Sequence, residues 1–327
     1  MLDLRKYFTP AMVAQRLKQM QPLKTTVVDT FFTRKVNHPF DKVGRSDLSG
    51  ILSTMPLINR GAPSLAVRRG VLSLDDYEPF EVAPHDFFTA ADMNRLKNLD
   101  EMSIEARLLA VDDNLRRVCR ATAEGISAKA LTGTIQWPVA LENGATDTYQ
   151  VSFGSTLSFT PSLLWDHADA KVRQVFSDLQ EMETKIEEAG YGGQVKFWAG
   201  KDVYTQLLAL TEVYGENPKA KLRIEVSDKG ISIGGFLIEK MAETYTDPVT
   251  GVATPKVAVN KIMAFATDAV HTLFYCALDD LDGNLSPMPY FSKNVKSADP
   301  SGVKIIGRSK PFPAPVVQAI CWATVVS

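Results

Sequence analysis

The sequence of 327 residues predicts an α+β protein in which long extended arms surround a compact domain. Three observations lead to this class. Residues 43–90 are broken by glycine and proline, residues 99–131 carry apolar side chains at helical spacing, and residues 157–285 alternate between helix-like and strand-like segments. Dense glycine and proline exclude a long helix. Spacing of three to four residues is typical of an amphipathic helix, and the alternation indicates a compact domain with a central sheet.

The N-terminal stretch is expected to begin with a helix in which Thr9 is the cap and Pro10 occupies the first turn. The next segment, TTVVDTFFTRKV, is rich in β-branched and aromatic residues and predicts a strand, which HPF at 38–40 interrupts. In residues 61–88 the strand formers continue, but the apolar positions are sparse. Since an isolated hairpin is marginally stable in water, this segment needs a burial partner that it does not itself supply.

Charge is distributed unevenly along the chain. Residues 1–72 carry 12 Lys and Arg against 4 Asp and Glu, a net of +8, whereas the remainder carries 24 against 34, a net of −10. A basic arm of this kind suggests an acidic partner, which could be nucleic acid or another copy of the chain, and a solvated basic face is an equally reasonable interpretation.

A long helix is predicted over 101–131, followed by a hairpin over 132–154 that turns at Asn143-Gly144. Thirty residues at 1.5 Å each would make a rod of about 45 Å. The third region opens with an amphipathic helix and continues through a second helix and several strands. The apolar positions of the first helix are Val172, Val175, Phe176, Leu179, Met182 and Ile186. The last apolar stretch, VVQAICWATVV, predicts a buried strand.

No catalytic or metal-binding constellation emerges from the sequence. The four histidines are dispersed, and the segment DDLDGN at 279–284 lacks the glutamate that would complete a calcium loop. Cys119, Cys276 and Cys321 are far apart in apolar surroundings and are interpreted as buried free thiols. No window of about 18 apolar residues is present to span a membrane. A structural role is therefore favoured over an enzymatic one, with no cofactor and no metal.

Three stretches together resemble the major capsid protein E family of tailed phages, typified by the phage lambda head protein, which has a Hong Kong 97-like capsid fold. VVDTFFTRKVNHPFDKV resembles the aromatic-rich segment that ends in a PF break. MPLINRGAPSLAVRRGVLSLDDYEPFEVAPHDFF is similar to the extension loop, and KNVKSADPSGVKIIGRSKPFPAPVVQAICWATV is similar to the C-terminal segment. The likeness covers nearly the whole chain.

The resemblance implies five parts of the chain. They are an N-terminal arm (1–42), an extension loop (43–90), a peripheral domain (91–156) with the spine helix 101–131 and hairpin 132–154, an axial domain (157–285), and a C-terminal segment (286–327) that returns to both domains. The extension loop would lie across a neighbouring subunit, which would supply its burial partner. The residues expected at that contact are Arg60, Arg68, Arg69, Asp75, Asp76 and Tyr77, and those of the basic arm are Arg5, Lys6, Arg16, Lys18, Arg34 and Lys35.

The implied function is that of a major capsid protein of a tailed phage or prophage-derived particle. Copies would form pentamers and hexamers and close into an icosahedral shell around double-stranded DNA, which the basic arm would contact without sequence specificity. The implied partners are a separate scaffolding protein, a portal and a decoration protein, with no membrane. Assembly is expected in the host cytoplasm, and the product is the virion. No lysine–asparagine pair is marked for cross-linking.

Three alternatives stay open at this point. The first is another virion component, such as a tail-tube or head-completion protein, although the two long helices argue against a mostly β tube. The second is an enzyme whose site is assembled from dispersed carboxylates, which strongly perturbed acids in one deep pocket would reveal. The third is a basic-armed DNA-binding module, although the part of the chain after residue 72 is acidic.

Overall fold

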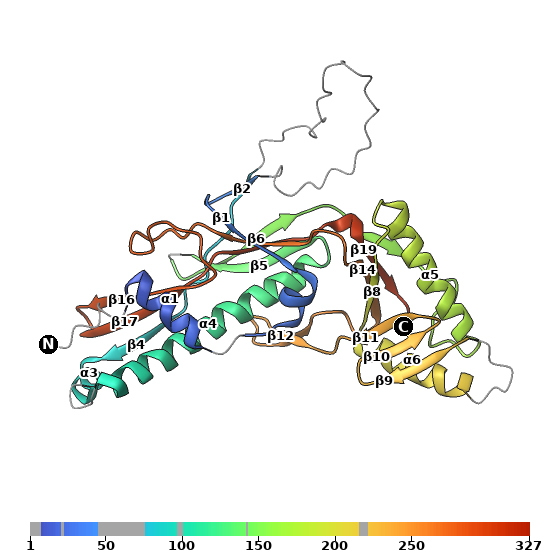
Figure 1. Cartoon of the computed structure of the whole chain (residues 1–327), viewed down its shortest axis with the longest axis horizontal. Helices are drawn as coiled ribbons and strands as arrows, with labels where there is room; N and C mark the ends of the chain where they lie inside the picture. The colour runs from blue at the N-terminus through green and yellow to red at the C-terminus, as the bar shows by residue number, and fades with distance from the viewer. Residues whose placement is uncertain (1–7, 21–22, 45–75, 97–100, 142, 216–221) are drawn as a thin grey trace, which may run out of the picture. The chain divides into compact units, whose positions relative to one another are not determined.

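The computed structural model describes residues 8–20, 23–44, 76–96, 101–141, 143–215 and 222–327. The chain divides into two compact units, and the division falls within one long helix, between Glu124 and Gly125. The described part of unit 1 contains the segments up to residue 124 together with 272–314. The described part of unit 2 contains residues 125–271 and 315–327. Figure 1 labels the elements.

Unit 1 combines helices from the first third of the chain with strands from both ends. Its helices are α1 (Pro10–Gln19), the π-helix η2 (Val27–Phe31), α3 (Ala90–Leu96) and the first part of α4 (Glu101–Ala130). Its strands are β1 (Arg34–His38), β2 (Val43–Gly44), β3 (Asp76–Tyr77), β4 (His85–Thr89), β15 (Thr272–Cys276), β16 (Phe291–Ser297), β17 (Gly302–Arg308) and β18 (Pro311–Ala314). They form the sheets β1-β15-β18, β16-β17-β4 and β2-β3.

The start of α1 follows the sequence prediction. Thr9 is the N-cap, its hydroxyl accepts a hydrogen bond from the Met12 N–H at 3.3 Å, and Pro10 occupies the first position. The next prediction is only partly correct. Val27–Phe31 is helical, and the strand β1 begins at Arg34, where it pairs in parallel with β15.

Unit 2 is built on one large mixed sheet. Its strand order is β7-β19-β14-β8-β11-β10-β9, and helices α5 and α6 lie along it (Figure 1). The helices are α5 (Val172–Glu188), α6 (Lys201–Gly215) and the short 3₁₀ turn η3 (Val317–Ala319). The strands are β5 (Thr134–Ala140), β6 (Thr146–Ser152), β7 (Leu157–Phe159), β8 (Val195–Ala199), β9 (Ile224–Ser227), β10 (Gly230–Ile233), β11 (Phe236–Lys240), β12 (Thr244–Thr246), β13 (Ala253–Pro255), β14 (Lys261–Ala266) and β19 (Ile320–Thr324).

The core of unit 2 lies between this sheet and the two helices. Five of the six apolar positions predicted for α5 are buried, and Phe176 packs against them while partly exposed. From the sheet, Phe197 is fully buried in the same cluster. Full burial of each such side chain stabilises the fold by about 1.5–3 kcal/mol. The buried indole N–H of Trp165 donates to the Asp178 carboxylate at 2.8 Å, which satisfies the one polar atom that this ring brings into the core.

Several other predicted elements are confirmed. The long helix runs over Glu101–Ala130, and the hairpin that follows pairs β5 with β6 around Gly144, whose φ is 80°. The stretch 320–324 is a mostly buried strand, β19. All three cysteines are buried and free. Among the residues that the structure describes, no helix is long and apolar enough to cross a membrane.

One strand falls outside the segment in which the sequence grouped it. β15 belongs to the stretch 157–285, but it pairs with β1 and β18 in unit 1. β19 comes from the C-terminal segment, which was expected to return to both domains, and it pairs with β14 and β7 in the sheet of unit 2. Pairing of this kind between distant strands is not encoded in the local pattern of either strand.

Candidate functional site

A small two-stranded ladder in unit 1 joins the chain on the two sides of residues 45–75. Val43 pairs with Tyr77 and Gly44 with Asp76, in antiparallel register. The ladder therefore holds residues 44 and 76 side by side in unit 1. Val43 is fully buried, and the Tyr77 ring stacks on Phe312 with 5.7 Å between ring centroids. These contacts fix β2 and β3 on unit 1.

A second set of contacts fastens the chain that follows β3. Val82 and Ser309 exchange two backbone hydrogen bonds of 2.8 and 3.0 Å. The guanidinium of Arg308 pairs with the Glu81 carboxylate at 2.5 Å and with Asp280 at 2.9 Å. Burial raises the pKa of Glu81, and the charge of Arg308 opposes that shift. These ion pairs join Glu81 to Arg308 of β17, and they join β17 to Asp280 in the turn that follows β15.

Most residues that the sequence assigned to the loop contact lie outside the described part of the chain. This holds for Arg60, Arg68, Arg69 and Asp75, while Asp76 is placed in β3 by its backbone only. Tyr77 is the one whose side chain is placed, and it contacts its own chain. Sequence reasoning missed Glu81 and Arg308, since no local pattern links two residues so far apart.

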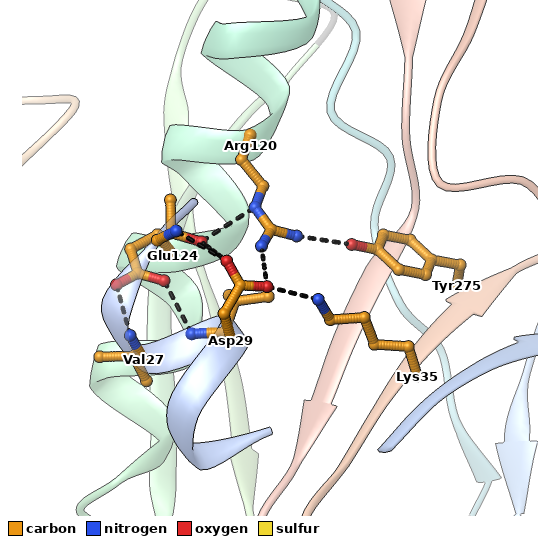
Figure 2. Close-up of polar contacts among 8 residues, drawn as sticks. Val27, Asp29, Lys35, Arg120, Glu124 and Tyr275 are labelled. Atoms are coloured by element: carbon orange, nitrogen blue, oxygen red, sulfur yellow. Dashed lines mark hydrogen bonds and ion pairs between the residues drawn. The ribbon is translucent and has the colours of Figure 1, made fainter. Parts of the chain in front are cut away.

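The N-terminal arm is anchored to α4 through Arg120 (Figure 2). Its guanidinium donates to the Asp29 carboxylate at 2.6 Å, to the Thr25 hydroxyl at 2.9 Å and to the Tyr275 hydroxyl at 3.3 Å. Asp29 also accepts from the ammonium group of Lys35 at 2.5 Å. Arg120 thus joins the arm, the long helix and β15 in one polar node.

Glu124 lies one turn further along α4 and is 4% exposed. Its two carboxylate oxygens accept hydrogen bonds from the backbone N–H groups of Val27 and Val28, at 2.8 and 2.9 Å (Figure 2). These N–H groups are at the start of η2, where a helix has no internal acceptors and where a negative charge is favourable. The strand predicted for Val27–Phe31 is therefore replaced by a helix, because Glu124 supplies a distant cap that the local sequence does not reveal.

The electrostatics of the node favour an ionised Asp29. Burial alone would raise the pKa of its carboxyl group, but hydrogen bonds from Arg120, Lys35 and the Thr25 backbone outweigh burial and lower the pKa to about 2. The ion pairs of the node are therefore formed at neutral pH.

The residues assigned to the basic arm are placed in different environments. Arg5 and Lys6 lie outside the described residues. Lys18 and Arg34 are exposed, and Lys35 is exposed while paired with Asp29. Arg16 departs from the expectation of a solvent-facing charge: it is 8% exposed, its guanidinium pairs with Asp112 at 2.7 Å, and it lies over the Phe8 ring. Its role in the described structure is to fix α1 against α4.

Acidic side chains with a raised pKa were the feature expected of a hidden enzyme site. Glu81 pairs with Arg308, Asp112 pairs with Arg16, and burial is the main cause of the raised pKa of each carboxyl group. A cavity of about 270 Å³ in unit 1 has no acid in its lining, which includes Arg116, Arg120, Tyr275 and Tyr290. Within the described ranges, no group of three His, Cys, Asp or Glu side chains could hold a metal ion.

Comparison with known proteins identifies the class of the chain. The family model described as phage major capsid protein E matches residues 9–325. The chain belongs to this family. A structure described as a prophage capsid protein from Escherichia coli CFT073 is similar at 14% identity and a TM-score of 0.66, with 98% of this chain and 99% of that chain covered.

A phage-related protein from Bordetella bronchiseptica RB50 is similar at 10% identity and a TM-score of 0.50, with 97% and 96% covered. No curated protein matched the chain. At these identities the solved structures establish the fold alone. The resemblance inferred from sequence and the α+β capsid fold are both confirmed. This chain is a major capsid protein of a phage or prophage, and hence a virion component that builds a shell.

Proposed function

We propose that this capsid protein closes into an icosahedral shell around double-stranded DNA through pentamers and hexamers, and that residues 43–90 form its extension loop, which lies across a neighbouring copy. The observation that carries the proposal is the ladder between β2 and β3. It brings residues 44 and 76, at the two ends of the proposed loop, side by side in unit 1. An arm of this kind has no core of its own in which to bury its apolar side chains, so it is suited to burial against another copy.

The arm has a different proposed role. Arg120 and Glu124 hold residues 25–35 on unit 1, while Lys18 and Arg34 keep their charges exposed. Exposed cations at the inner surface of a shell would neutralise phosphates without reading sequence. The further proposed partners are a separate scaffolding protein, a portal and a decoration protein, and the proposed place of assembly is the host cytoplasm.

The proposed mechanism is assembly without bond chemistry. Three buried acids have a raised pKa and already have partners in the same chain: Glu81 pairs with Arg308, Asp112 pairs with Arg16, and Asp178 accepts a hydrogen bond from the Trp165 indole N–H. A carboxylate that already forms a close ion pair is poorly suited to act as a general base. This arrangement supports a structural role for these groups.

The test is electron microscopy of the expressed protein, alone and with its scaffold, over a range of salt concentrations. The wild-type chain should form closed shells. Deletion of residues 61–72 should leave folded capsomers that do not close, since the loop tip is removed while the β2–β3 ladder stays in place.

A matched control separates contacts from chain length. Replacing residues 61–72 with a Gly/Ser linker of equal length keeps the span but removes the side chains, and this variant should also fail to close. A wild-type chain that stays monomeric under every condition would contradict the shell proposal, and closed shells from the deletion variant would contradict the role of the loop.

A further inference from the structure

The turn that follows β15 presents two leucines to solvent. Leu281 is 83% exposed and Leu285 is 53% exposed. Phe40, whose carbonyl oxygen accepts a hydrogen bond from the Ala277 N–H at the base of this turn, is 65% exposed. Exposed leucines are common singly, but two within one short turn, with an exposed phenylalanine bonded to the base of that turn, are a feature that an interaction surface would explain.

The turn is held in one conformation. The Asp280 carboxylate, whose side chain is fully buried, pairs with Lys293 at 2.6 Å and with Arg308 at 2.9 Å. Asn284 and Leu285 have φ values of 55° and 51°, which β-carbon sterics disfavour for a leucine. Strain at consecutive residues persists only where the surroundings fix the backbone. The exposure of the leucines is therefore built into the turn, since buried ion pairs fix its base.

Two acidic side chains of the turn are exposed to solvent, whereas the basic side chains that pair with them are largely buried. The side chains of Asp279 and Asp282 are 66% and 70% exposed. Their basic partners lie beneath them: the Lys310 side chain is 4% exposed and that of Lys293 is 18% exposed. The face that meets solvent is accordingly acidic as well as apolar.

One segment of the chain has the complementary composition. Residues 48–74 contain no acidic residue, and their only charged residues are Arg60, Arg68 and Arg69. The same segment carries apolar residues between those arginines, including Leu65 and Val67. An apolar and basic segment matches an apolar and acidic turn in both respects.

We propose that the turn 279–285, together with Phe40, is the surface on which residues 57–69 of a second copy dock. Leu281 and Leu285 provide the apolar contact, and Asp279 and Asp282 face Arg68 and Arg69 of the neighbour. This inference rests on the proposed function and deepens it, because it names the receiving surface for the extension loop.

A photo-cross-linker at position 281 tests the proposal directly. The chain with Leu281→p-benzoylphenylalanine is mixed with isotopically labelled wild-type chain, assembled, irradiated and analysed by mass spectrometry. The expected product joins position 281 of one copy to residues 57–69 of another, and it is absent from unassembled chain. A cross-link to any other segment, or within one copy, overturns the inference even when the shells are normal.

A charge exchange gives an independent test. Asp279→Lys/Asp282→Lys should abolish shell closure, and adding Arg68→Asp/Arg69→Asp should restore it. The exposed Val213→Ser, at a residue 71% exposed in α6, is the matched control and should close normally. If wild-type shells form and the charge-reversed variant also closes, the docking surface is wrong while the capsid function stands. If wild-type chain forms no shell, the proposed function itself fails.

Discussion

The two units are stabilised in different ways. Unit 2 has a large apolar cluster between its sheet and helices, with Leu179, Phe197 and Ile238 fully buried. Unit 1 also buries apolar side chains, such as Phe32, Phe291 and Phe312, and it adds buried ion pairs such as Arg16–Asp112 and Arg308–Asp280. Apolar burial is non-directional and scales with area, whereas ion pairs require particular partners at particular distances. The comparison indicates that unit 1 combines apolar packing with directional contacts that fix separate chain segments against one another.

The largest expected effect comes from opening the apolar core of unit 2. Phe197→Ala removes a fully buried ring that packs edge-on against Phe236 at 5.4 Å. The free energy of unfolding should fall by about 3–5 kcal/mol, since both transfer and cavity terms are lost. Urea unfolding followed by tryptophan fluorescence measures this fall in the free energy of unfolding. Leu237→Ala, at a residue 38% exposed on the same sheet, is the control and should cost far less. Equal losses for the two variants would contradict this account of the core.

The next effect tests a buried ion pair of unit 1. Asp112→Ala leaves the Arg16 guanidinium buried without its partner, and the free energy of unfolding should fall by about 3 kcal/mol. The double variant Arg16→Met/Asp112→Leu removes both charges and should recover most of the loss, because no unpaired charge remains. Thermal unfolding of the wild-type chain, the single variant and the double variant measures the loss of stability and its recovery. A double variant as unstable as the single one would show that Arg16 and Asp112 stabilise chiefly through packing.

A smaller effect should appear as acid sensitivity of the arm. The folded-state pKa of Asp29, about 2, lies below its ordinary value of 3.8, so its stabilising contribution is present above pH 4 and is lost as pH falls through 2. Because 31% of the side chain is exposed, screening limits the contribution to about 1 kcal/mol. The free energy of unfolding, measured from pH 5 to pH 2, should fall by about this amount as the pH falls. The Asp29→Asn variant should show a smaller fall over the same range. An unchanged fall in that variant would assign the sensitivity to other acids.

The three cysteines can report on the two units separately, with almost no perturbation. Burial raises the pKa of the Cys119 and Cys276 thiols to about 12 and that of Cys321 to about 11. The first two lie in unit 1 and the third in unit 2. Iodoacetamide labelling in rising urea, read by mass spectrometry, should modify Cys119 and Cys276 at lower urea than Cys321. Simultaneous labelling would indicate that the units unfold together.

Local pattern was sufficient to predict much of this fold. The apolar spacing of 101–131, the Asn143-Gly144 turn and the amphipathic face of α5 depend on neighbours within a few residues, and the structure has each of them. Val27–Phe31 was predicted as a strand because the acceptors for its free N–H groups come from Glu124, 96 and 97 residues away. Arg16 was assigned to a solvent-facing arm because nothing near it in sequence indicates Asp112. Long-range polar partners are the information that a single sequence lacks.

The parallel pairing of β1 with β15 has a consequence for the order of folding. Arg34 pairs with Thr272 and His38 with Cys276, so this ladder cannot form before most of the chain has been synthesised. Contacts between residues so distant in sequence form slowly, because closure of a long loop must precede any gain in contacts. β1 therefore stays unpaired with β15 until residues 272–276 are present, even though Arg120 and Glu124 can hold the preceding residues of the arm as soon as α4 forms. A chain released before residue 276 cannot complete this ladder.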